Sequence, residues 1–177
     1  MDNVFAKPNH STFSWDSLGN IVEGRGDLGT EMPVLVYRLM QFTLLDVLAK
    51  DVGQAVANDY LRAAGHLAGR EFAKNVLDLT ASFDVFVANL QKALQQYKIG
   101  ILRMEVFQPE TGEIVLTVGE DLDCSGLPIT NETVCDYDEG FIAGILETYT
   151  GKTYKVREVD CWASGDRVCR FRGIVTG

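Results

Sequence analysis

Residues 156–174, VREVDCWASGDRVCRFRGI, have the pattern of a β-hairpin near the end of the chain. The two ends of this stretch are rich in β-branched and aromatic residues, as strands are. In its middle, Ser164-Gly165-Asp166 can form a three-residue loop in which the glycine takes a positive φ. Closing the hairpin at this loop predicts that Cys161 lies directly opposite Cys169.

Two cysteines in this position can bind a metal ion. Opposite residues on one face of antiparallel strands have Cβ atoms about 4.5–5.5 Å apart, which suits two sulfurs that each lie about 2.3 Å from one zinc ion. Cys135, at the entrance to a predicted helix, is a candidate for a third ligand from above the sheet. Ordinary buried thiols and a disulfide between Cys161 and Cys169 are the alternatives to a metal site.

The fourth ligand has two candidates. Glu158 lies three residues before Cys161, so a regular strand would aim it at the opposite face, and it reaches the metal only if a bulge or bend intervenes. Cys124 is a softer ligand on a predicted loop, and the residues alone favour it. Either set gives a net charge of about −2. The nearby donors that could compensate this charge are Arg157, Arg167 and Arg170.

The upstream sequence predicts three helices after an N-terminal arm. Residues 1–30 mix aromatic, polar and glycine residues and are expected to be an extended arm with at most one short strand. Pro33 suits the first turn of a helix over about 33–50. A second helix is expected over about 54–77, and Ser82 is a candidate N-cap for a third, which carries an apolar stripe.

The hydrophobic period then changes from 3.6 to 2, which indicates strands. The expected elements are a hairpin over 102–106 and 114–118, a helix over about 136–150, and the final hairpin of 156–161 and 168–174. The order ααα-ββ-α-ββ predicts a single α+β domain over residues 31–177, with a small antiparallel sheet packed by helices.

Charge and composition exclude several classes of function. The net charge of −9 argues against nucleic-acid binding and against a polybasic membrane contact. The most apolar stretch, 33–46, is too short to span a bilayer, and no secretory signal is recognisable, so a cytoplasmic, reducing location is expected. Two groups of acidic residues are interpreted as a solvated loop and as first-turn helix charges: Glu120, Asp121 and Asp123, and Asp136 and Asp138.

The C-terminal residues carry the signature of a known family. The segments are Val134-Cys135 through Gly140-Phe141-Ile142-Ala143-Gly144, Val156 through Cys161, Gly165-Asp166, Cys169 through Gly173, and the Gly65-x-x-x-Gly69 pattern. With these residues the chain resembles the 4-vinyl reductase-type domain, also called the hydrocarbon-binding domain. The resemblance implies a fold like that of the haem–nitric oxide sensor and vesicle-tethering subunits, a homodimer, and an apolar pocket.

The resemblance also implies a metal-ligand set. The chain is similar to zinc-containing sensor domains of aromatic-responsive transcription activators, in which three cysteines and a glutamate hold a structural zinc. These ligands correspond to Cys135, Glu158, Cys161 and Cys169, and imply that the strand at Glu158 bends. Cys124 is an addition relative to those sensors, so it remains an alternative fourth ligand, and an iron–sulfur cluster remains an alternative to zinc.

The sequence favours a binding module over an enzyme. It contains no dinucleotide-binding G-x-G-x-x-G motif and no P-loop, and Gly65 and Gly69 are interpreted as sites of close helix packing. We therefore expect a non-enzymatic domain that binds and senses an aromatic, tetrapyrrole-like or isoprenoid-like molecule. A redox sensor and a zinc-stapled dimeric scaffold are the alternatives. The candidate pocket residues are Phe83, Phe86, Leu90, Tyr97, Met104, Leu116 and Phe141.

Overall fold

The structure is a computed structural model that describes residues 13–108 and 110–176. The chain divides into two compact units, residues 1–30 and 31–177. In the described part of the first unit, a 3-10 helix, Trp15–Leu18, precedes the one-turn helix α1, Ile21–Gly24. The Asn20 side chain caps α1 by accepting a hydrogen bond from the Glu23 N–H at 3.2 Å. The expected extended arm is therefore wrong for residues 15–24, where this cap signal was missed.

Three helices open the second unit, as predicted: α2, Val34–Val52; α3, Gln54–Val76; and α4, Phe83–Gln96. Gly53 separates α2 from α3 with a positive φ of 86°, which favours glycine. Pro33 is the N-cap residue of α2 rather than part of its first turn. Ser82 is the N-cap residue of α4, but its side chain makes no capping hydrogen bond.

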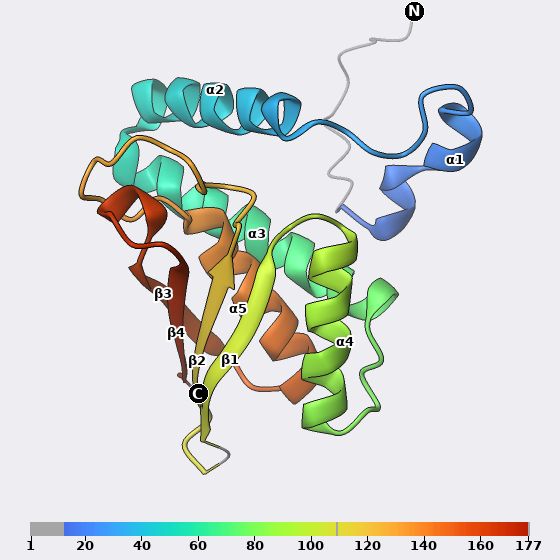
Figure 1. Cartoon of the computed structure of the whole chain (residues 1–177), viewed down its shortest axis with the longest axis vertical. Helices are drawn as coiled ribbons and strands as arrows, with labels where there is room; N and C mark the ends of the chain where they lie inside the picture. Colours follow the sequence, from blue (N-terminus) through green and yellow to red (C-terminus); the bar gives the residue numbers. More distant parts are fainter. Residues whose placement is uncertain (1–12, 109, 177) are drawn as a thin grey trace, which may run out of the picture. The chain divides into compact units, whose positions relative to one another are not determined.

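The remaining elements form a four-stranded antiparallel sheet and one more helix. The strands are β1, Ile101–Gln108; β2, Glu113–Gly119; β3, Tyr154–Asp160; and β4, Cys169–Val175, in the order β1-β2-β4-β3, and the helix is α5, Asp136–Thr150. Figure 1 shows the sheet in front of α5 and α3, with α4 beside β1. The α+β class and the small antiparallel sheet are confirmed.

The final hairpin differs from its predicted form. Glu158 pairs with Phe171 and Asp160 pairs with Arg170, so Val159 is an extra residue that makes a bulge in β3. The strand ends at Asp160, and a 3-10 helix, Trp162–Ser164, replaces the simple three-residue loop. Cys161 and Cys169 therefore form no ladder pair. The bend that the family resemblance implied near Glu158 is present.

Helices α3 and α5 pack unusually closely through glycines on both. A Cβ atom built on any of these glycines would lie well under 3.0 Å from a backbone oxygen of the other helix, which real Cβ atoms do not do. The glycines are Gly65 and Gly69 on α3 and Gly140 and Gly144 on α5. The interpretation of Gly65 and Gly69 as close-packing positions is confirmed.

None of the helices in the described part of the chain is long and apolar enough to cross a membrane.

Candidate metal centre and adjoining cavity

Four cysteines from separate elements meet in one place. Cys124 lies in the loop after β2, Cys135 is the N-cap residue of α5, Cys161 follows β3, and Cys169 begins β4. All four are buried, free thiols, and their sulfur atoms all lie within 4.8 Å of one another. The fold thus brings together residues up to 45 positions apart in sequence.

The spacing of the sulfurs fits a tetrahedral metal site. Four sulfurs that each lie about 2.3 Å from a zinc ion are about 3.8 Å apart. The Cys135 sulfur lies 3.9 Å from that of Cys161 and 3.8 Å from that of Cys169. The sulfurs of Cys124 and Cys169 are closer, at 3.0 Å, yet farther apart than the roughly 2.05 Å of a disulfide. The donor set is soft and suits zinc or an iron–sulfur cluster.

The thiols act on one another electrostatically. Hydrogen bonds from Cys124, Cys135 and Cys169 lower the pKa of Cys161, and a backbone N–H of Ala163 adds to this effect. Hydrogen bonding with Cys124 and burial raise the pKa values of Cys135 and Cys169. The cluster therefore favours the thiolate form of Cys161, which a cation would stabilise further.

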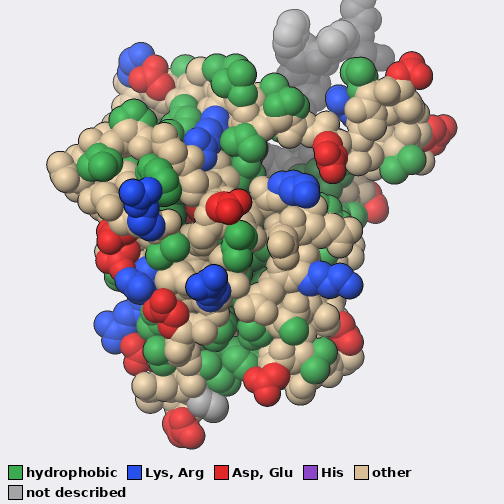
Figure 2. Space-filling model, in the orientation of Figure 1, with side chains coloured by type: hydrophobic (Ala, Val, Ile, Leu, Met, Phe, Trp, Pro, Cys, Tyr) green, Lys and Arg blue, Asp and Glu red, His purple; other side chains and the backbone are tan. Residues whose placement is uncertain are grey.

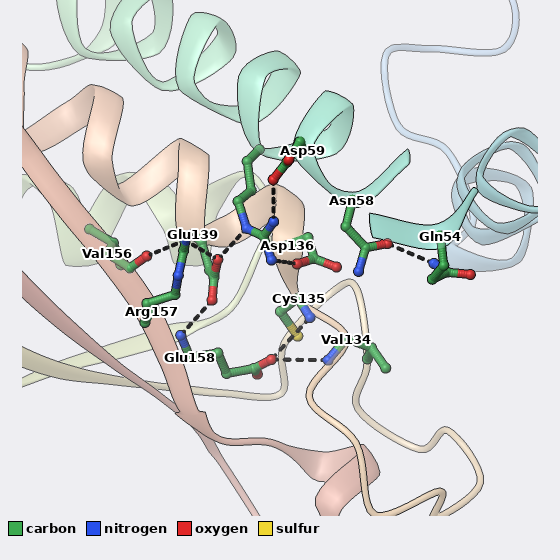
Figure 3. A network of polar contacts seen from close by, with 11 residues as sticks. Gln54, Asn58, Asp59, Val134, Cys135, Asp136, Glu139, Val156, Arg157 and Glu158 are labelled. Carbon is green, nitrogen blue, oxygen red and sulfur yellow. Dashed lines mark hydrogen bonds and ion pairs between the residues drawn. The ribbon is translucent and has the colours of Figure 1, made fainter. Parts of the chain in front are cut away.

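Glu158 lies beside this cluster and holds the backbone (Figure 3). Its Oε2 atom accepts hydrogen bonds from the N–H groups of Val134 and Cys135, at 3.1 and 3.0 Å. Its Oε1 atom is buried and has no hydrogen-bond partner among the residues that the structure describes. Burial raises the pKa of this carboxyl to about 8. In the set of metal-ligand atoms that lie together, Cys124 takes the place that the family resemblance gave to Glu158.

A polar network connects Glu158 to α3 and α5 (Figure 3). The buried Glu139 on α5 accepts hydrogen bonds from the Glu158 N–H at 2.8 Å, from Arg62 at 2.6 Å and from Arg157 at 2.7 Å. Arg62 on α3 also pairs with Asp136, next to Cys135, and with Asp59. The network thus fixes the backbone on both sides of the metal centre.

The arginines expected to compensate the metal site have other partners. Arg157 pairs with Glu139, Arg170 pairs with Glu105 and Asp160, and Arg167 lies over the ring of Trp162. Each of the three guanidinium groups thus contacts an acidic or aromatic side chain outside the cysteine cluster.

Side chains of α2 form hydrogen bonds with the loop that carries Cys124. Tyr37 and Gln41 donate hydrogen bonds to Asp123 at 2.8 and 2.7 Å. Arg38 donates to the carbonyl oxygens of Leu122 and Ser125, at 2.8 and 2.9 Å. Burial raises the pKa of Asp123. The interpretation of this segment as a solvated loop is wrong for Asp121 and Asp123, since both are buried under these contacts.

A cavity of about 30 Å³ lies between α4, α5 and the β1–β2 half of the sheet. Its lining includes six of the predicted pocket residues: Phe83, Phe86, Leu90, Met104, Leu116 and Phe141. Tyr97 is outside it: this side chain is 52% exposed and packs edge-on against Phe72. The only lining residues that are not apolar are Asp121 and Asp138, which sequence reasoning had assigned to a solvated loop and a helix terminus.

The two acidic residues lie at the end of the cavity nearest the thiols. Oxygen atoms of Asp121 and Asp138 and the Cys135 sulfur lie within 4.8 Å of one another. Asp121 accepts hydrogen bonds from the N–H groups of Asp123 and Cys124, at 2.8 and 3.1 Å. Burial raises the pKa of Asp121 to about 6 and that of Asp138 well above its usual value.

Comparison with known proteins finds a family model that matches the C-terminal part of the chain, distant relatives, and solved structures with the same fold. The family model of the V4R domain matches residues 114–174. An uncharacterized protein of Methanocaldococcus jannaschii is 28% identical over 145 residues, which cover 82% of this chain and 79% of that protein. A solved vinyl-4-reductase family protein from the same organism has a TM-score of 0.59 at 16% identity, covering 85% of each chain.

Two further solved structures share the fold. The phenol-responsive sensory domain of the transcription activator PoxR, solved with phenol, has a TM-score of 0.64 at 14% identity, covering 83% of this chain and 76% of that one. A trafficking protein particle complex subunit 3 from Naegleria fowleri, covalently bound to palmitic acid, has a TM-score of 0.65 at 15% identity, covering 81% and 95%.

An H-NOX protein from S. oneidensis matches with a TM-score of 0.52 at 14% identity, covering 77% of this chain and 72% of that one. The predicted likeness to the haem–nitric oxide sensor and vesicle-tethering folds is thus confirmed, as is the family resemblance.

Proposed function

We propose that this chain, whose residues 114–174 match the family model of the V4R domain, binds and senses a small apolar molecule and does not convert it chemically. The observation that carries the proposal is the cavity, whose lining is apolar except at Asp121 and Asp138. Small-molecule sites typically combine an apolar lining with a few polar groups. The PoxR sensory domain with phenol and the trafficking subunit with palmitic acid support this function by analogy of fold.

The ligand enters by rearrangement of side chains. A volume of about 30 Å³ has room for about two water molecules, so an aromatic ring needs more space. Two residues of the lining are half-buried: Phe83, at the start of α4, and Met104, in β1. An unbranched Met side chain changes rotamer at low cost. We propose that these two side chains move to admit the ligand.

We further propose that Cys124, Cys135, Cys161 and Cys169 hold a structural zinc ion, and that Glu158 holds the backbone of the ligand Cys135. A site with four protein ligands has no open position for substrate, so a bound zinc would supply no chemistry beyond its coordination bonds. Its ligands would connect the β2 loop, α5, β3 and β4, and thereby brace one end of the cavity. A reducing, cytoplasmic setting, as expected from the sequence, keeps such thiols available.

A homodimer through α2 completes the proposal. This helix has no buried residue, and a series of aliphatic side chains is exposed along it: Val34, Leu35, Val36, Leu39, Met40, Leu44 and Val47. Figure 2 shows apolar side chains along the part of the surface where α2 lies. A second copy of the helix presents the same surface, and a two-fold axis makes such a surface self-complementary.

Thermal stabilisation by apolar compounds tests the binding function. Ligands such as phenol, toluene and short isoprenoid alcohols should raise the melting temperature in proportion to RT ln(1 + [L]/Kd). The variant Leu116→Phe places added atoms in the cavity and should remove this rise. Leu28→Phe makes the same change at an exposed position outside the cavity and outside α2 and should retain it. A rise that persists in Leu116→Phe would refute binding in this cavity.

Two other functions each have one supporting observation. The 3.0 Å separation of the Cys124 and Cys169 sulfurs favours a thiol-based redox sensor, which predicts metal-free protein that forms a disulfide under mild oxidation. The small cavity volume favours a dimeric scaffold held together by a metal ion, which predicts no stabilisation by any apolar compound.

An iron–sulfur cluster is the alternative to zinc at the four cysteines, and it predicts a coloured protein that bleaches in air.

A further inference from the structure

We propose that the cavity selects an apolar molecule that carries a protonated amine, which the carboxyl groups of Asp121 and Asp138 bind. This inference rests on the proposed binding function and names the class of its ligand.

The two carboxyl groups form the polar end of the otherwise apolar cavity. Asp121 follows β2 and is 3% exposed, and Asp138 lies in the first turn of α5 and is 8% exposed. Both line the cavity, and their oxygen atoms lie within 4.8 Å of each other. A group bound at this end of the cavity could therefore contact both.

One acceptor in this end of the cavity lacks a partner. The Oδ2 atom of Asp138 is buried and makes no hydrogen bond within the described residues. Nearly all buried polar atoms in proteins are hydrogen-bonded, and an unpaired carboxyl oxygen is costly. Asp136, two residues earlier on the same helix, instead pairs with Arg62. Asp138 thus differs from its neighbour in facing the cavity without a basic partner.

The lining determines which head group fits. It contains two acidic residues and no Arg, Lys or His residue, so it offers acceptors and no cation. An ammonium group has three donors and no acceptor, and its hydrogen bonds to carboxylates are about twice as strong as neutral ones. A hydroxyl group can satisfy only one acceptor with its single proton. A ligand carboxylate would find no cationic partner in this lining.

Calorimetric titration of the metal-loaded protein with four compounds of one skeleton tests the selection. Benzylamine should bind at least about tenfold more tightly than benzyl alcohol, toluene more weakly than the alcohol, and benzoate not measurably. Equal binding of toluene and benzylamine would overturn the amine inference and leave the apolar-pocket function intact. Binding of none of the four would overturn the proposed function and this inference with it.

A matched pair of variants locates the contact. Asp138→Asn keeps the side-chain volume and should reduce the preference for benzylamine over benzyl alcohol to within about twofold, with toluene binding unchanged. Asp136→Asn is the same change outside the cavity and should keep the preference. Elemental analysis should find one metal ion per chain in all three proteins. Two ions per chain, or a preference retained in folded Asp138→Asn, would overturn the inference.

Discussion

Single residues determine how closely the two central helices approach. Gly140 lies against the backbone oxygen of Arg62, and Gly65 lies against that of Tyr137, so α3 and α5 contact each other through backbone atoms. This contact places Glu139 within reach of Arg62 and thereby aligns the start of α5, where Cys135 and Asp138 lie. Glycine at these positions thus helps to position Cys135 and Asp138, because it sets how closely α3 and α5 pack.

The Gly140→Ala variant should lose about 3 kcal/mol of unfolding free energy, because its Cβ would overlap the Arg62 carbonyl oxygen and force the helices apart. The urea denaturation midpoint measures this loss. Gly24→Ala makes the same change in a helix where no atom lies within 4 Å of the new Cβ, so its midpoint should not fall. Equal midpoints for the two variants would contradict the close packing.

At the residue level, the sequence offers signals for chemistry that is local and none for burial that depends on distant contacts. Thiolate softness favoured Cys124, and this cysteine lies in the sulfur cluster. Asp123 gave no local sign of burial, because the groups that bury it, Tyr37 and Gln41, are more than 80 positions away. The Tyr97 assignment failed because the apolar stripe of α4 extends past the end of the cavity.

At the scale of elements, Glu139 joins three of them. It lies on α5, receives Arg62 from α3, and accepts the backbone N–H of Glu158 in β3. Periodicity located these helices and strands to within a few residues. It could not locate the bulge at Val159 or the 3-10 helix after Cys161. Both lie where the end of β3 contacts α5 and the cysteine cluster, and such tertiary contacts leave no periodic pattern in the sequence.

Replacing Glu139 by Ala should cost about 3 kcal/mol and weaken zinc binding by tenfold or more, because it removes a shared partner of Arg62 and Arg157 and leaves the buried Glu158 N–H without this acceptor. Denaturant unfolding and competition with a chromophoric chelator measure the two effects. Asp59→Ala removes an exposed partner of the same Arg62 and should change stability by less than about 0.5 kcal/mol. Unchanged zinc affinity in Glu139→Ala would rule out a supporting role for the network.

At the scale of the molecule, α2 connects the cysteine cluster to an exposed apolar surface. Arg38, Tyr37 and Gln41 hold the loop that carries Cys124, while Leu39 and Met40 project from the same helix into solvent. Helical spacing predicted the helix but not which of its residues would be covered. Within one chain these apolar side chains stay exposed, and the partner chain that we propose to cover them is something that sequence periodicity could not supply.

The Leu39→Glu variant should convert a dimer into a monomer, because it places a charge in the apolar face proposed to pair with its copy. Sedimentation equilibrium measures the change. Gln96→Glu adds the same charge at an exposed position of α4 and should leave the dimer intact. A monomeric parent protein, or a dimeric Leu39→Glu, would place the dimer interface elsewhere or exclude it.

Zinc-edge X-ray absorption of tag-free protein, with elemental analysis of the same sample, tests the metal centre most directly. The account predicts about one zinc per chain with four sulfur neighbours at about 2.3 Å. Three sulfurs and one oxygen would return Glu158 to the ligand set in place of Cys124. A protein without bound metal, its sulfurs joined in pairs, would contradict the account.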